Sequence, residues 1–142
     1  MDSAERETCE KNLAIIKEFY RAIDETGDWQ ASAHIFDFDN LVLYEADGMP
    51  YGGIWHGEAA FRRFNTMIYE TWQPLQHKIL EYTAGGDLVI VYLQMVGTGR
   101  TGLTYSMTIC EPWRLKNGKV VEIRPHYFDT YRLRMIDGRL PM

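Results

Sequence analysis

Cysteine and histidine are scarce in this chain. Its 142 residues include two cysteines, Cys9 and Cys110, and four histidines. The cysteines stand far apart, and no two histidines have the HxxxH or HxH spacing that brings two imidazoles to one metal ion. The sequence therefore predicts reduced structural thiols, no dedicated metal site and no cofactor.

Long apolar runs and basic clusters are absent as well. No stretch is apolar enough over a sufficient length to cross a membrane, and the segment MDSAERETCEKN is too charged for a signal peptide. The formal net charge is −5, and no basic run alternates with aromatic residues. We therefore expect a cytoplasmic protein that binds neither membrane nor nucleic acid.

Aromatic residues, by contrast, are abundant. They make up 13% of the chain and include nine tyrosines and four tryptophans. Such side chains offer large apolar surfaces with a polar handle, which suits a cavity or an interface, and an aromatic-rich core is the alternative. The length fits one domain over residues 1–142 that can bury a core and enclose a pocket.

The pattern of apolar residues predicts helices first and long strands afterwards. Apolar residues recur at helical spacing in residues 2–26, 29–36 and 58–72. Strand character marks two short segments and four long ones, which are residues 41–46, 54–56, 76–83, 88–98, 103–115 and 119–131. Turns rich in Gly and Asn separate the long strands, as in hairpins. Residues 134–142 are expected to form a loosely ordered tail.

This order of elements predicts an α+β domain. Helices that precede a run of antiparallel strands cover one face of the sheet. A strongly curved antiparallel sheet with helices across its mouth forms a cone, and a cone leaves a pocket at its wide end. The sequence therefore predicts a cone-shaped sheet wrapped around helices.

The segment GKVVEIRPHYFDT, residues 118–130, carries the most suggestive acid. Read as one strand, its alternate side chains point to opposite faces. One face then holds Val121, Ile123, Pro125, Tyr127 and Asp129. A carboxylate on an apolar face must find hydrogen bonds, find a cation or stay protonated. Asp129 beside Tyr127 is therefore a candidate general acid or base.

Several phrases resemble the SnoaL-like branch of the nuclear transport factor 2-like superfamily. They are KEFYRAIDETGDW, PYGGIWHG, CEPWRLKNGKVVEI and HYFDT, and together they span nearly the whole chain. The branch is similar to ketosteroid isomerase, limonene-epoxide hydrolase, scytalone dehydratase and the polyketide cyclases. The resemblance implies the cystatin-like, nuclear transport factor 2-like α+β barrel. It implies less about the reaction, because this fold hosts many chemistries and also proteins with none.

The resemblance to ketosteroid isomerases implies two further acids. Their general base ends the first strand, where this chain has Glu45, with Tyr44 as the alternative in register. Their protonated oxyanion-hole aspartate corresponds to Glu111. Their helix tyrosine falls on Phe19, next to Tyr20.

The resemblance to limonene-epoxide hydrolase concerns the last strand. A similar tyrosine-phenylalanine-aspartate run there supplies a catalytic aspartate, which corresponds to Asp129. That hydrolase also needs an arginine bracketed by aspartates. Here the arginine is Arg100, without an aspartate nearby.

Each acid also has a structural interpretation. Asp129 could cap the strand end or pair with Arg132 or Arg134, and Glu45 could be a solvated acid at a strand end. Glu111 shares a predicted strand face with apolar residues, so it is either a functional acid or the partner of a nearby arginine.

Other candidates are aromatic residues and histidines. The candidate substrate-binding residues, any of which could instead belong to the core, are Tyr20, Tyr44, Tyr51, Trp55, Tyr92, Tyr105 and Trp113. His34 and His77 could reach a cavity, whereas His126 lies on the strand face opposite Asp129.

These observations favour an enzyme that moves protons without a cofactor. Its substrate would be a hydrophobic oxygenated small molecule of polyketide, terpenoid or steroid type, and its reaction isomerisation, cyclisation or dehydration. Asp129 or Glu45 would act as the base, and Tyr127 or protonated Glu111 would donate to the enolate oxygen. The alternatives are an epoxide hydrolase, a non-catalytic carrier of hydrophobic ligands and a protein-interaction module.

A homodimer is also expected. The predicted outer strand face carries Glu122, Arg124, His126 and Phe128, and related folds pair through the open side of the sheet.

Overall fold

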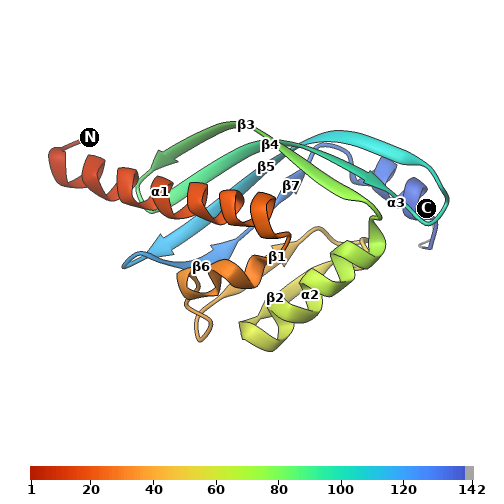
Figure 1. Ribbon diagram of the computed structural model, residues 1–142, viewed down its shortest axis with the longest axis horizontal. Coiled ribbons are helices and arrows are strands. Elements are labelled where there is room, and N and C mark those ends of the chain that lie inside the picture. Colours follow the sequence, from red (N-terminus) through yellow and green to blue (C-terminus); the bar gives the residue numbers. More distant parts are fainter. Residues whose placement is uncertain (140–142) are drawn as a thin grey trace.

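A computed structural model describes residues 1–139 of the chain (Figure 1). Its elements are α1 (Ser3–Thr26), a 3₁₀ helix η1 (Trp29–Ile35), β1 (Val42–Glu45), β2 (Gly53–His56), α2 (Gly57–Thr71), β3 (Leu75–Gly85), β4 (Leu88–Thr98), β5 (Thr104–Lys116), β6 (Lys119–Ile123), β7 (His126–Tyr127) and α3 (Thr130–Asp137). The order of helices and strands follows the prediction up to β6.

The sheet is curved and open. Its strands follow the order β2-β1-β6-β5-β4-β3, and β7 pairs with β5 beside β6. All neighbouring strands are antiparallel except β1 and β6, which run parallel. Figure 1 shows the sheet arching over α1 and α2. The predicted α+β fold with a curved sheet around helices is confirmed, although the sheet does not close into a barrel.

Helix α1 has clear signals at both ends. Asp2 and Glu5 form a capping box, in which each side chain accepts from the other residue's backbone amide. Gly27 ends the helix with φ of 69°, a left-handed conformation that glycine adopts without strain. Ile16, Phe19 and Tyr20 are buried on the side that packs against the rest of the core. This helix therefore delivers a tyrosine hydroxyl to the interior.

Strand β6 contains an irregularity that changes its faces. Leu115 of β5 pairs with Val120 of β6, and Trp113 pairs with Ile123. Between these two pairs β6 has two residues and β5 has one, so β6 contains a bulge. Val120 and Ile123 are both buried, whereas Val121 is only partly so. Such a bulge interrupts the alternation of side chains. The prediction that Val121 shares the inner face is therefore wrong, while Ile123 and Tyr127 do face inward.

The end of the chain differs most from the prediction. The single strand expected over residues 119–131 stops at Ile123, and only the short β7 follows beyond Pro125. A helix, α3, then occupies part of the expected tail, with Leu133 and Ile136 buried. The burial of these apolar side chains in the core stabilises α3 against the rest of the domain. The last three residues of the predicted tail, 140–142, lie outside the described residues.

Candidate functional site

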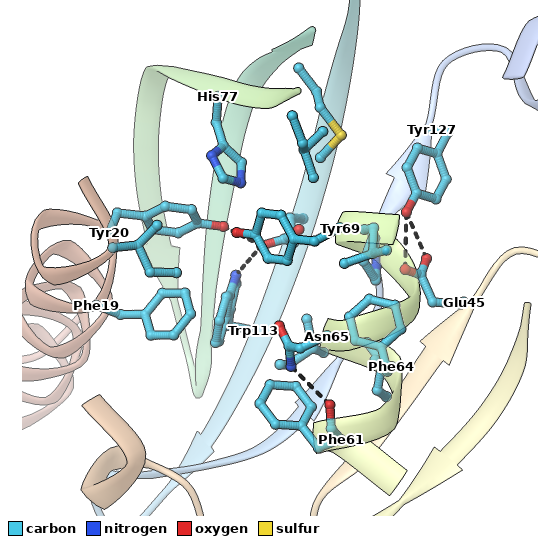
Figure 2. Close-up of a pocket in the computed structure, with 18 residues that line it drawn as sticks. Phe19, Tyr20, Glu45, Phe61, Phe64, Asn65, Tyr69, His77, Trp113 and Tyr127 are labelled. Atoms are coloured by element: carbon cyan, nitrogen blue, oxygen red, sulfur yellow. Dashed lines mark hydrogen bonds between the residues drawn. The ribbon is translucent and has the colours of Figure 1, made fainter. Parts of the chain in front are cut away.

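A pocket lies between α1, α2 and the concave face of the sheet. Figure 2 shows Glu45 and Tyr127 on one side of it, Tyr20, Trp113 and His77 on the other, and side chains of α2 between them. Most of its lining is apolar or aromatic. The volume open to the centre of a water molecule is about 80 Å³. The pocket thus suits a small molecule rather than a polymer.

Glu45 is the buried acid on one side of this pocket. It ends β1, where burial alternates along the strand, and its side chain turns inward with only 6% exposed. The Tyr127 hydroxyl donates to its two oxygens at 2.9 and 3.0 Å. Burial raises the pKa of Glu45 well above its usual range; the Tyr127 hydrogen bond opposes this, and the charge of Glu111 adds to it.

Glu111 is the acid on the other side. It lies on β5, and its Oε1 accepts from the Tyr20 hydroxyl and, at 2.9 Å, from Trp113 Nε1. Among residues 1–139, no group donates a hydrogen bond to Oε2. Burial raises the pKa of Glu111, and the two donors oppose that rise. The carboxyl therefore keeps one oxygen open to the pocket.

The phenols around both acids stay protonated. Burial and the charge of Glu111 raise the pKa of Tyr20 well above its usual value, and burial and Glu45 do the same for Tyr127. Both hydroxyls are therefore hydrogen-bond donors across the working pH range. The tyrosine that reaches Glu111 is Tyr20, not its neighbour Phe19, which lines the pocket as an apolar wall.

Three more polar residues line the pocket. His77, on β3, has its pKa lowered by burial, against the opposing charge of Asp24, so a neutral imidazole faces the cavity. Asn65 and Tyr69, on α2, were not predicted. Asn65 lies one helical turn from Phe61 and Ile68, so a polar residue within an apolar helical stripe was the available signal for it.

Asp129 lies outside the pocket. Its side chain accepts from the backbone N–H of Arg132 at 3.0 Å and caps α3, so the predicted place beside Tyr127 on a common strand face is wrong. The break at Pro125 ends the alternation on which that prediction rested. Arg100, the arginine considered for epoxide hydrolysis, is exposed between β4 and β5 and does not line the pocket either.

The predicted aromatic walls divide into two groups. Tyr20 and Trp113 line the pocket. The others do not, and they are Tyr44, Tyr51, Trp55, Tyr92 and Tyr105. Tyr92 is exposed on the outer face, and Tyr105 is buried against Trp72 with ring centroids 4.8 Å apart. The alternation of side chains along a strand predicts which face a residue lies on, but not how deeply its side chain is buried.

A shallow groove lies on the other side of Glu45. Glu45 and Tyr127 form part of its wall, together with Tyr44, Arg124 and His126. The Arg124 guanidinium stacks on the Tyr44 ring at 3.7 Å, a cation–π contact. Glu45 thus lies in the wall between the pocket and the outer surface.

Within residues 1–139, no three His, Cys, Asp or Glu side chains gather as a metal-binding group. No helix in that same range has the length and apolar character of a membrane span.

The chain is similar to one described domain family and to many solved structures. A family model described as a SnoaL-like domain matches residues 16–123. No curated protein sequence matches the chain.

Three of the solved structures illustrate the likeness. An NTF2-like protein of unknown function from Burkholderia pseudomallei is 22% identical, covers 89% of this chain and 96% of its own, and has a TM-score of 0.80. TerC, co-crystallised with polyporic acid, is 19% identical over 90% and 98% of the two chains, with a TM-score of 0.79. A putative SnoaL-like polyketide cyclase from Jannaschia sp. CCS1 is 17% identical over 93% and 94%, with a TM-score of 0.73.

Proposed function

We propose that this chain, which belongs to the SnoaL-like domain family, is an enzyme that transfers protons on a small, largely apolar carbonyl compound without a cofactor. The observation that carries the proposal is the pair of buried carboxyls, Glu45 and Glu111, each held by a tyrosine in one pocket. Buried acids with raised pKa values are typical of general acid–base sites.

The two acids have different surroundings, and these assign their roles. Two carboxyls in one apolar site do not both ionise at neutral pH. Glu111 has two side-chain donors on one oxygen, whereas Glu45, whose pKa burial raises further, shares one side-chain donor, the Tyr127 hydroxyl, between its two oxygens and interacts besides with the backbone N–H of Ala46. We therefore assign the carboxylate to Glu111 and the proton to Glu45. This reverses the roles that the resemblance to ketosteroid isomerases implies.

The reaction then runs between the two acids. Glu111 Oε2 removes a proton from the carbon next to the substrate carbonyl, and the electron pair moves to the carbonyl oxygen. Glu45 donates a hydrogen bond, and then its proton, to that oxygen, which gives the enol. Glu111 then returns its proton to a carbon of the enol while Glu45 takes back the hydroxyl proton, so both acids regain their starting states. The apolar walls support both steps, because charges interact more strongly where water is excluded.

The likeness to other proteins supports the ligand class but not the reaction. One structural relative carries the name of a putative polyketide cyclase, and another was co-crystallised with polyporic acid. Isomerisation and aldol-type cyclisation both begin with the same proton abstraction. The proposal therefore names the shared first step rather than one product.

The experiment is hydrogen exchange on apolar ketones in D₂O. Monocyclic and bicyclic ketones such as cyclohexanone and 2-tetralone serve as probes, and NMR follows deuterium entering the position next to the carbonyl. The wild-type protein should accelerate exchange, and Glu111→Gln should lower the acceleration by on the order of a hundredfold. The matched control is Asp129→Asn, which neutralises a carboxylate outside the pocket and should keep the wild-type rate.

The outcome that would overturn the proposal is equally concrete. A ketone that quenches tryptophan fluorescence saturably, and so binds, yet exchanges no faster than in buffer would point to a non-catalytic carrier. Equal rates for the wild type and Glu111→Gln would remove Glu111 from the mechanism.

A further inference from the structure

Two polar residues of α2, Asn65 and Tyr69, stand one helical turn apart at the edge of the pocket. Both also line a second outer groove, whose wall includes Trp29 and Arg62. These two side chains therefore stand at the boundary between the pocket and the surface, which we call the mouth. The proposed reaction uses neither of them.

The Asn65 carboxamide is held in one orientation. Its Nδ2 donates a hydrogen bond of 2.9 Å to the backbone carbonyl oxygen of Phe61. A carbonyl only accepts, so the amide nitrogen must face Phe61 and Oδ1 must lie on the other side. Figure 2 shows that oxygen directed into the cavity, away from Phe61. Among residues 1–139, no group donates to Oδ1, so Asn65 offers the pocket a fixed acceptor.

The Tyr69 hydroxyl is the complementary group. Figure 2 shows its ring reaching from α2 toward Tyr20. Within the described part of the chain, the hydroxyl has no hydrogen-bond partner. Burial and the charge of Glu111 raise the pKa of Tyr69, so the hydroxyl stays protonated and can donate. A donor and an acceptor therefore project from neighbouring turns of one helix into the same cavity.

A ligand hydroxyl satisfies both residues, whereas a carbonyl satisfies only one. The hydroxyl gives its hydrogen to Asn65 Oδ1 and accepts from Tyr69 through its oxygen. A carbonyl oxygen has no hydrogen to give to Asn65. A methyl group at the mouth would exclude water and leave both side chains unpaired, which costs binding free energy. The pair therefore favours a ligand that carries a hydroxyl besides its carbonyl.

His77 is the other polar side chain of the pocket that has no hydrogen bond to residues 1–139. It lies on β3, and its imidazole packs edge-on against the Tyr20 ring with centroids 6.1 Å apart. A neutral imidazole has both a donor and an acceptor nitrogen, so it can bind a hydroxyl or a carbonyl alike. His77 therefore gives less selection than the single free acceptor of Asn65.

We propose that Asn65 and Tyr69 are specificity-determining residues, which select small apolar ketones that carry a hydroxyl group at the mouth of the pocket. The inference rests on the proposed function, because the ketone is the substrate of that reaction. It narrows the substrate class from apolar carbonyl compounds to hydroxyketones. It also orients the substrate, with the carbonyl between Glu45 and Glu111 and the hydroxyl toward α2.

The experiment compares the binding of 4-hydroxycyclohexanone and 4-methylcyclohexanone. The two probes share the ring and the ketone and differ only in a hydroxyl or a methyl group of similar size. Saturable quenching of tryptophan fluorescence gives the dissociation constant of each probe, with Trp113 as a reporter in the pocket. The ratio of the two constants is the selectivity, and its measurement requires no turnover.

Asn65→Leu should shift the selectivity toward the methyl probe by about tenfold, because the hydroxyl loses its acceptor and the methyl gains an apolar neighbour. Leucine has a similar volume and a higher helix propensity, so α2 should stay folded, and thermal melting verifies this. Tyr69→Phe is the more conservative second variant. It should shift the selectivity in the same direction by about threefold, because water can replace part of the bond at this partly exposed site.

Thr66→Val is the matched control. The Thr66 hydroxyl donates to the backbone carbonyl of Arg62 at 3.2 Å, four residues back along the helix, as Asn65 does to Phe61. Thr66 lines the outer groove but not the pocket. Its replacement should keep the selectivity within about twofold of the wild type.

Three outcomes would overturn the inference. They are the same selectivity in the wild type, Asn65→Leu and Tyr69→Phe, a wild type that does not bind the hydroxyl probe, and a shift that appears only in His77→Phe. Failure of the inference is separate from failure of the proposed function. Shifted selectivity without hydrogen exchange would leave the recognition intact and refute the reaction, and exchange with unchanged selectivity would do the reverse.

Discussion

Replacing Tyr20 by phenylalanine tests whether Glu111 is the ionised acid. The change removes only the hydroxyl that donates to Glu111 Oε1 and leaves the Trp113 hydrogen bond in place. A hydrogen bond to a charged group contributes about 1.5–3 kcal/mol, and one between neutral groups about 0.5–1.5 kcal/mol. The cost of Tyr20→Phe therefore depends on the charge of Glu111.

The sign of the pH dependence follows from the donor. Tyr20 stays neutral because its pKa is raised, so it donates at every pH used. Tyr20 stabilises the ionised form of Glu111, and its loss raises the pKa of Glu111. We expect Tyr20→Phe to lower the free energy of unfolding by about 2 kcal/mol at pH 8, where Glu111 is ionised, and by about 1 kcal/mol at pH 4, where it is protonated.

Urea denaturation at both pH values, followed by tryptophan fluorescence, measures the difference. The control is Tyr82→Phe, since the Tyr82 ring also contacts Tyr20 but its hydroxyl makes no bond to Glu111. A loss that is equal at pH 8 and pH 4 would show that Glu111 does not change charge between them, and the assignment of the carboxylate would be refuted.

Three further predictions concern other residues. Glu45→Gln should raise the free energy of unfolding at pH 8 but not at pH 4. Burial raises the pKa of Glu45 in the folded state above the ordinary 4.5, so at a pH between these two pKa values Glu45 ionises only in the unfolded chain. This lowers the free energy of unfolding of the wild type by about 1.4 kcal/mol for each unit by which the pKa is raised, and the variant lacks that loss. Urea titrations at both pH values check this. Asp129→Ala should cost about 1 kcal/mol through loss of the α3 cap, measured the same way, while ketone exchange stays at the wild-type rate. The expected homodimer should appear as twice the chain mass in light scattering at micromolar concentration, and Phe128→Asp, which changes a side chain that is 84% exposed, should shift it toward the monomer.

The sequence predicts the site where local alternation holds. Glu45 and Glu111 lie in strands, where the family resemblance placed them as candidates, and the structure brings both into the same pocket with Tyr127. The sequence alone did not predict that they converge. Their roles stay a proposal. The fold is predicted well for the same reason, because helix caps and hairpin turns are local signals.

The sequence fails where tertiary packing decides. Asp129 was expected in the pocket because an unbroken strand was assumed, whereas Pro125 interrupts it and α3 begins directly afterwards. The contact between Trp72 and Tyr51 joins residues that are 21 positions apart and depends on how α2 meets the loop after β1. No periodicity encodes such a contact, so only the structure reveals it.

The central claim is that one carboxyl of the pocket is protonated and the other ionised at neutral pH. Infrared spectroscopy of protein labelled with carbon-13 at the glutamate carboxyl tests it directly, because a protonated acid has a C=O stretch distinct from that of a carboxylate. We predict a protonated band at pH 7 that is lost in Glu45→Gln and kept in Glu111→Gln. Absence of the band in the wild type, or its loss only in Glu111→Gln, would contradict the account.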